Sequence, residues 1–188
     1  MYHILAKYKL TSLHIMVVIL GLTGVFGKLI SLGAIHLVWY RMGIAFLSLA
    51  IFLAFKKQLF SVNKKDFFGI MGVGALVTFH WLCFFESIKV STVSVAVVCL
   101  ATSSLFSALI EPLFFKRKLL GYEVVMGVIV IIALGFVMGT ETQYLWGYFY
   151  GIMAALLGTL FTLFNAKYIK KVGAAQITMI EMLSGLFI

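Results

Sequence analysis

Six apolar runs of roughly twenty residues follow one another along this chain, with only short connections between them. The hydrocarbon core of a bilayer is about 30 Å thick, so a helix needs roughly 20 apolar residues to cross it. This pattern predicts an all-α membrane protein, built as a polytopic helical bundle. The predicted helices are Leu13–Leu32, Ile35–Phe55, Phe67–Ser87, Thr92–Phe115, Val124–Gly139 and Trp146–Ile169.

A seventh apolar run begins near Ile177, and the sequence ends at Ile188. At about 1.5 Å per residue, a helix over this run extends only ~18 Å, which is well short of a bilayer core. We therefore expect the chain to be the first part of a larger polytopic protein. Its function is then the function of that larger protein.

Composition excludes several other classes of protein. The chain is 63% hydrophobic and only 11% charged, whereas a soluble domain carries about 25% charged residues. The net charge of +9 does not indicate a nucleic-acid partner, because the basic residues lie in short clusters between apolar runs. Cys83 and Cys99 both lie inside apolar runs, so neither a disulfide framework nor a metal site is expected, and no cofactor is predicted.

The distribution of basic residues predicts the orientation. Twelve of the 15 lysines and arginines fall at the ends of the predicted helices that share one side of the membrane. The other side receives only Lys28, Arg41 and Lys89. Cytoplasmic loops carry the excess of positive charge, so the N-terminus is predicted to be cytoplasmic in a cell inner membrane. The twelve are Lys7, Lys9, Lys56, Lys57, Lys64, Lys65, Lys116, Arg117, Lys118, Lys167, Lys170 and Lys171.

The start of the sixth predicted helix repeats features of the first. Ile15-Met16 and Leu20-Gly21 recur as Ile152-Met153 and Leu157-Gly158, and a second, slightly larger offset places Arg41 on Glu181. Because an odd number of helices separates the two copies, they cross the membrane in opposite directions. Inverted repeats of this kind are typical of secondary transporters, which bind substrate near the midplane where the repeats meet.

The chain also resembles the EamA family of the drug/metabolite transporter superfamily. The resemblance implies a ten-helix fold of two inverted five-helix repeats, with residues 1–143 as the first repeat and 144–188 as the start of the second. It implies a carrier for a small metabolite. The stretches that carry it are Arg41–Leu47, Glu86–Ala96, Ser104-Leu105-Phe106, Glu111-Pro112-Leu113, Gly127 and Gly135.

Two positions depart from the family pattern. The usual proline in the middle of the fourth helix is Ser104 here, and the usual Glu-Arg pair after that helix falls in Lys116-Arg117-Lys118. The first departure removes the expected cause of a kink at that level, although Pro112 provides a place for a bend eight residues later.

Ionisable side chains within membrane spans cost roughly 2.5–3.5 kcal/mol each on insertion scales, so they are candidate functional residues. Arg41 and His80 are predicted to lie at similar depth, with Tyr40 and Trp81 beside them. A cavity holding these four suits an organic substrate with an anionic or aromatic part. Two alternatives stay open. Arg41 either extends to the interface or pairs with Glu86, and His80 forms an interhelical hydrogen bond.

Three glutamates complete the set of candidate residues. Glu86 and Glu181 are included as substrate-binding residues, and Glu181 is the best candidate for carrying a proton. The repeat places Glu181 opposite Arg41, so a facing pair is one hypothesis. Glu111 lies within reach of Lys116 and Arg117, where a structural ion pair is favoured over a proton relay.

These features together predict a secondary transporter that moves a small organic metabolite by alternating access. The expected partners are a small-molecule substrate, membrane lipid and a coupling proton or cation, and a homodimer is an open option. A non-transporting scaffold or sensor is the main alternative. A membrane-embedded enzyme is less favoured, because no HExxH, CxxC or close pair of acidic residues occurs.

Overall fold

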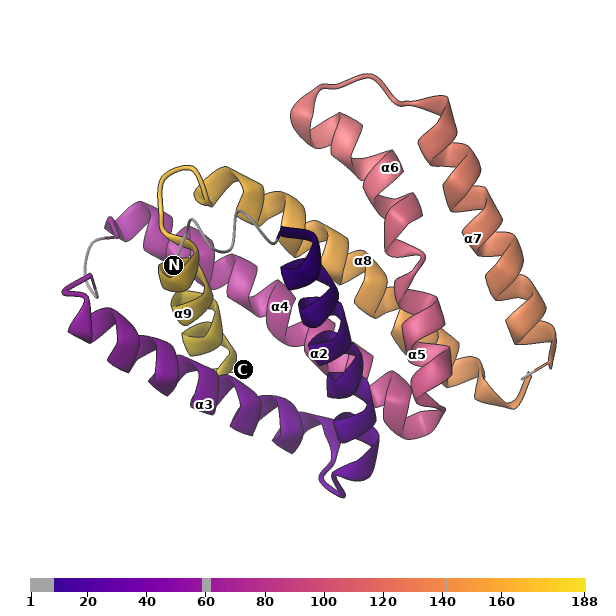
Figure 1. Cartoon of the computed structure of the whole chain (residues 1–188), viewed down its shortest axis with the longest axis horizontal. Coiled ribbons are helices and arrows are strands. Elements are labelled where there is room, and N and C mark those ends of the chain that lie inside the picture. The colour runs from indigo at the N-terminus through magenta and orange to yellow at the C-terminus, as the bar shows by residue number, and fades with distance from the viewer. Residues whose placement is uncertain (1–8, 59–61, 141) are drawn as a thin grey trace.

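The computed structural model describes residues 9–58, 62–140 and 142–188, and within them every regular element is helical (Figure 1). Lys7, one of the residues behind the predicted orientation, lies outside the described residues. A short 3-10 turn, Thr142–Tyr144, precedes α8. The helices are α2 Lys9–Leu29, α3 Ala34–Phe55, α4 Lys64–Val90, α5 Val93–Leu100, α6 Ser103–Phe115, α7 Gly121–Thr140, α8 Leu145–Tyr168 and α9 Ala174–Gly185.

In the described part of the chain, six spans are long and apolar enough to cross a membrane, with α5 and α6 together making one of them. Their outward faces are apolar. On α7, for example, Ile129 and Phe136 are 53% and 75% exposed. Burying such surface is what stabilises a protein in water, so a bundle that leaves it outside requires lipid around it. The predicted all-α polytopic bundle is confirmed.

Helices α4 and α8 form the centre of the bundle, and the remaining helices pack around them (Figure 1). Helix α9 packs against α3 and α4, while α2 packs against α4 and α5. Helices α6 and α7 form a hairpin at the side of the bundle remote from α3 (Figure 1). This arrangement places α3, α4 and α9 side by side, although α9 follows α3 by more than a hundred residues.

Small residues set the close approach of α8 to its neighbours. A Cβ atom on Gly147 would lie 2.4 Å from Ser91 Cβ, and one on Gly151 would lie 2.6 Å from Cys99 Cβ. In α2, Gly24 and Gly27 similarly contact side chains of α5 and α4, whereas Gly21 has no neighbour within 4 Å. Glycine permits this contact because helices in lipid associate through tight packing rather than through the hydrophobic effect.

The fourth predicted span is broken rather than continuous. Helix α5 ends at Leu100 and α6 begins at Ser103. Thr102 Oγ1 donates to the Cys99 carbonyl at 2.7 Å, and Ser104 Oγ donates to the Ala101 carbonyl at 2.8 Å. Hydroxyls bonded to nearby carbonyls compete with the α-helical ladder, which accounts for a break without proline. Pro112, where a bend was predicted, lies inside α6.

Two lysines tie the ends of α2 and α4 together. Lys28 Nζ donates to the carbonyls of Ile88 and Ser91 at 2.8 and 2.7 Å, and Lys89 Nζ donates to the carbonyl of Ile30. The last carbonyls of a helix have no intrahelical partner and carry partial negative charge, so ammonium groups stabilise them. These contacts hold the α2–α3 loop close to the end of α4.

Candidate functional site

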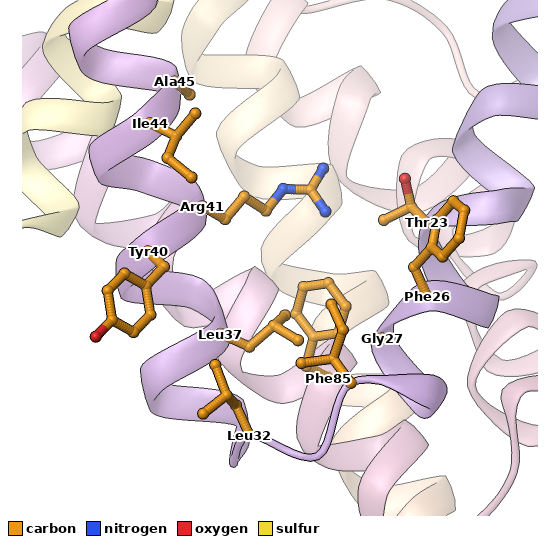
Figure 2. Close-up of a pocket in the computed structure, with 11 residues that line it drawn as sticks. Thr23, Phe26, Gly27, Leu32, Leu37, Tyr40, Arg41, Ile44, Ala45 and Phe85 are labelled. Atoms are coloured by element: carbon orange, nitrogen blue, oxygen red, sulfur yellow. The ribbon is translucent and has the colours of Figure 1, made fainter.

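A pocket of about 500 Å³ lies between α2, α3 and α4, and most of its lining is apolar. Figure 2 shows the Arg41 side chain projecting from α3 towards α2, where Thr23 lies on the opposite wall. Ligand pockets commonly join an apolar lining to a few placed polar groups. The lining residues are Thr23, Phe26, Gly27, Ile30, Leu32, Leu37, Tyr40, Arg41, Ile44, Ala45 and Phe85.

Arg41 is held in this pocket by aromatic contacts. Its Cζ atom lies 3.9 Å from the centroid of the Trp81 ring and 5.8 Å from that of Phe85. A guanidinium stacked on an aromatic face is attracted by the ring quadrupole, and it keeps its N–H groups free to donate at its edge. The stack therefore orients the cation without consuming its hydrogen-bonding capacity.

No carboxylate among the described residues neutralises Arg41. The ion pairs in this part of the chain all belong to Arg117, and no side-chain hydrogen bond joins the Arg41 guanidinium to another described residue. Glu86, the predicted pairing partner, is half-buried on α4 and does not line the pocket. Glu86 follows Trp81 by five residues, a rotation of about 140° around the helix, so it faces another direction. The alternative of an Arg41–Glu86 pair is wrong.

The predicted cavity shared by Arg41 and His80 is also not formed. His80 Nδ1 donates to the Ala154 carbonyl at 2.7 Å, which matches the alternative of an interhelical hydrogen bond. Its ring packs at 5.3 Å from both Trp81 and Phe161. Adjacent residues on a helix point about 100° apart, so Trp81 faces Arg41 while His80 faces α8.

His80 instead lines a second cavity of about 400 Å³ between α4, α6 and α8. Ser103 and Ser107, which the sequence places on one helix face, both line it, and so does Thr159 from α8. Arg41 and His80 therefore line two different pockets, one mostly apolar and one with several hydroxyl groups. Tyr40, the remaining residue of the predicted cluster, is 54% exposed and lines the first pocket.

Glu181 does not face Arg41. It is 5% exposed on α9, and its Oε1 accepts a hydrogen bond from Asn165 Nδ2 at 2.6 Å. On α3 it is Met42 that meets α9, because Gly185 packs directly on the Met42 side chain. Arg41 precedes Met42 by one residue and so points elsewhere. The hypothesis of a facing Arg41–Glu181 pair is wrong.

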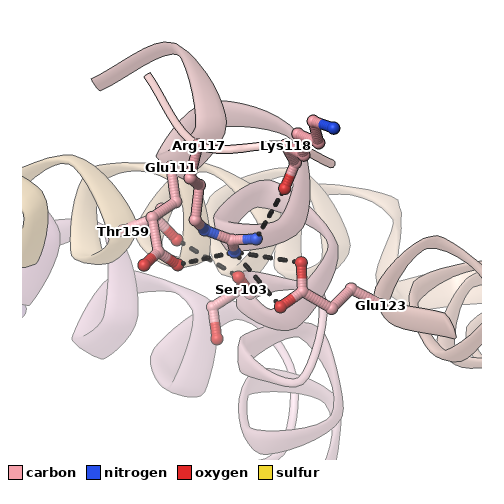
Figure 3. Close-up of polar contacts among 6 residues, drawn as sticks. All are labelled: Ser103, Glu111, Arg117, Lys118, Glu123 and Thr159. Carbon is pink, nitrogen blue, oxygen red and sulfur yellow. Dashed lines mark hydrogen bonds and ion pairs between the residues drawn. The ribbon is translucent and has the colours of Figure 1, made fainter. Parts of the chain in front are cut away.

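The predicted ion pair at Glu111 is confirmed. Arg117 Nη2 lies 3.2 Å from Glu111 Oε2 and 2.9 Å from Glu123 Oε2, so one guanidinium bridges α6 and α7 (Figure 3). The hydrogen bonds that Arg117 donates to the carboxylates of Glu111 and Glu123 raise the pKa of Arg117, which lies between the two helices. These groups are partly exposed, and exposed ion pairs contribute little to stability. The network links the end of α6 to the start of α7 across the loop between them.

Sequence reasoning missed Phe85 and Asn165. Phe85 forms part of the aromatic support of Arg41, but nothing distinguishes it from the other phenylalanines of α4. Asn165 could have been identified from the sequence, because it is the single asparagine inside a predicted span. An amide within a membrane needs a hydrogen-bonding partner, and Glu181 is that partner.

Comparison with known proteins agrees with this architecture. The model of the EamA-like transporter family matches residues 9–139, which cover more than half of the chain. A protein of Haemophilus influenzae named as an uncharacterized transporter is 29% identical over 156 residues. That match covers 78% of this chain and 51% of the relative, so the chain spans about half the length of the relative. No solved structure matches the chain.

Proposed function

This chain belongs to the EamA-like transporter family, and we propose that it forms part of a secondary transporter that moves a small organic anion across the membrane. The observation that carries the substrate class is the guanidinium of Arg41. It lies 3.9 Å over Trp81, faces an apolar pocket of about 500 Å³ and has no carboxylate partner among the described residues. A charge in such a place is costly, and binding an anion offsets that cost.

The lining supports an anion with an apolar body. Phe26, Leu37 and Phe85 give the pocket its apolar walls, and these walls remove apolar substrate surface from water. The Thr23 hydroxyl adds one polar group across from Arg41 (Figure 2). A strongly hydrated inorganic anion would lose its water here with few donors to replace it. An aryl or alkyl acid can bind both features of the pocket: its apolar body contacts the apolar walls, and its anionic group contacts Arg41.

Transport of permanently charged probes tests the proposal. The whole gene product, reconstituted in proteoliposomes, is expected to take up radiolabelled benzenesulfonate or hexanesulfonate with saturable kinetics. The matched cations are benzyltrimethylammonium and hexyltrimethylammonium, and none of the four crosses lipid by losing its charge. Protein-free liposomes measure leakage. Saturable uptake of the cations alone would overturn the anion assignment, and a lack of saturable uptake of all four would overturn the carrier.

The proposal includes alternating access between two inverted repeats, with residues 1–143 as the first and 144–188 as the start of the second. It also sets the N-terminus in the cytoplasm of an inner membrane, because twelve of the 15 basic residues fall on that side. Alkaline phosphatase folds only outside the cytoplasm, so a fusion at Gly33 is expected to be active and a fusion at Asn63 inactive. The reverse pattern would contradict this orientation.

A further inference from the structure

Glu181 lies in a setting that differs from the Arg41 pocket in both place and chemistry. It is on α9, only 5% exposed, and packed against α4 at Gly74. A Cβ atom on Gly74 would lie 2.8 Å from Glu181 Cα and 2.9 Å from its carbonyl oxygen. Glu181 lines neither the Arg41 pocket nor the His80 cavity, so it does not touch a substrate bound in either.

The hydrogen bonds around Glu181 are too few for an ionised carboxylate. Asn165 Nδ2 supplies one donor at 2.6 Å, and no basic residue in the described part of the chain forms an ion pair with Glu181. A buried carboxylate is stable only when it is paired or accepts several hydrogen bonds. A single neutral donor does not replace the water that the charge has lost.

The other atom of the Asn165 amide indicates what is missing. Asn165 Oδ1 is the buried side-chain polar atom without a hydrogen-bond partner in the residues that the structure describes. An amide oxygen only accepts hydrogen bonds, and a carboxylate has no hydrogen to donate. A protonated carboxyl has one. A carboxylic acid and a primary amide can pair through two hydrogen bonds, N–H to C=O and O–H to C=O, which satisfy both groups.

A cavity provides a route for the proton. A pocket of about 280 Å³ between α8 and α9 is lined by Asn165, Ile177 and Thr178. Glu181 lies one helical turn beyond Ile177, and Asn165, which lines the pocket, donates a hydrogen bond to the Glu181 carboxyl. Water in this pocket can therefore exchange a proton with Glu181 once the amide moves aside.

Among the described residues, no other charged group on the neighbouring helices forms an ion pair with Glu181, and several of these groups have partners elsewhere. On α3, Arg41 lies over Trp81, and Lys56 at its end lies over Phe52. On α8, Lys167 lies over Phe114 and Phe164. On α4, His80 donates to Ala154 and Lys89 donates to Ile30, while Lys64, Lys65, Asp66 and Glu86 belong to its end turns. Tyr168, at the end of α8, packs against Gly69.

We propose that Glu181 is the residue that carries the coupling proton of this transporter, and that Asn165 is the positioning residue that holds its protonated form. The coupling role of Glu181 rests on the proposed transport function, whereas its protonated state does not. In the proposed state the carboxyl is neutral: it accepts the hydrogen bond from Asn165 Nδ2, and its O–H donates to Asn165 Oδ1, the atom that otherwise has no partner among the described residues. When α8 and α9 separate, the Glu181 O–H bond breaks, the proton passes to water, and a carboxylate remains.

Infrared spectroscopy tests the protonated state without any substrate. The whole gene product in lipid is expected to show the carbonyl band of a buried carboxylic acid at neutral pH. Glu181→Gln should remove this band, and Asn165→Leu, which leaves the acid without its amide partner, should shift it. Glu123→Gln, the same change in the loop-facing Arg117 network, should leave it in place. A band that survives in Glu181→Gln, or its absence from the folded wild-type protein, would overturn the inference.

Flux measurements test the coupling. In wild-type proteoliposomes a pH gradient is expected to drive accumulation of benzenesulfonate, whereas Glu181→Gln should lose accumulation yet keep equilibrium exchange. Flux that does not depend on the pH gradient, or that depends on a Na⁺ gradient instead, would overturn the coupling role of Glu181. It would leave the proposed carrier function unaffected. Absence of flux for every probe would count against the proposed function, and the infrared band would still decide the state of Glu181.

Discussion

Replacing Arg41 with leucine is expected to weaken the saturable uptake of benzenesulfonate strongly, through a loss of affinity, while the protein stays folded. A hydrogen bond to a charged group contributes about 1.5–3 kcal/mol, which corresponds to a loss of affinity of roughly 10- to 150-fold. Leucine keeps apolar contact with the Trp81 ring, so the change removes charge without emptying the pocket. Uptake into proteoliposomes measures the loss. Binding can be followed by Trp81 emission once the other tryptophans of the gene product, Trp39 and Trp146 among them, are replaced by phenylalanine.

Two variants separate a binding role from a general effect of charge. Arg41→Lys keeps the positive charge but loses the planar group that stacks on Trp81, so we expect partial uptake. Arg117→Gln removes a cation from the exposed network between α6 and α7, and uptake should remain close to that of the wild type. If Arg41→Leu and Arg117→Gln reduced uptake equally, the assignment of the Arg41 pocket as the substrate-binding site would be wrong.

Gly74→Ala is expected to destabilise the bundle by about 1–3 kcal/mol, the usual cost of overpacking. The added methyl group would lie 2.6 Å from Ser184 Cβ and 2.8 Å from Glu181 Cα. The second of these is a backbone atom that cannot rotate away, so α9 must move off α4. Unfolding in mixed micelles with increasing dodecyl sulfate measures the free energy. The same displacement should weaken the infrared band of the Glu181–Asn165 pair.

Gly72→Ala is the matched control, because it lies two residues earlier on the same helix and has no neighbour within 4 Å. There the only effect is the higher helix propensity of alanine, which favours the folded state by up to about 1 kcal/mol. The two substitutions therefore change stability in opposite directions. Equal stability of both variants would mean that α4 and α9 are not in close contact.

The helices themselves were predictable from the sequence because lipid constrains them so strongly. Apolar runs locate the spans, and the observed α3 begins one residue before the predicted Ile35 and ends at the predicted Phe55. The Glu111–Arg117 ion pair was predictable for a similar reason, since Glu111 lies near the end of α6 and Arg117 follows in the loop only six positions later. Local spacing determines both features.

Contacts between distant helices were not predictable, because they depend on the rotation of each helix about its own axis. His80 and Trp81 are neighbours in sequence but face α8 and Arg41 respectively. Depth in the membrane can be estimated by counting residues, whereas direction depends on which face packs inward. The predicted Arg41–His80 cavity was wrong because of the rotation of α4, which turns the two neighbouring side chains in different directions. The same error placed Glu181 opposite Arg41.

The break between α5 and α6 was missed for a different reason. The absence of proline at Ser104 argued against a kink, yet the helix is interrupted at Ala101 and Thr102. The signal was present in the consecutive hydroxyl residues Thr102, Ser103 and Ser104. In a span without water, such side chains find their partners in the carbonyls of the preceding turn.

A helix break stabilised by hydroxyl groups differs from a proline kink in the free energy needed to restore a continuous helix. Proline removes an amide permanently and costs about 3 kcal/mol in a straight helix. From Val93 to Ile110 no proline occurs, so every residue in this stretch keeps an N–H for the α-helical ladder. Exchanging a hydroxyl contact costs only about 0.5–1.5 kcal/mol. Restoring a continuous helix here would therefore cost less than it would at a proline, and a ligand with unequal affinity for the broken and continuous forms would shift their populations.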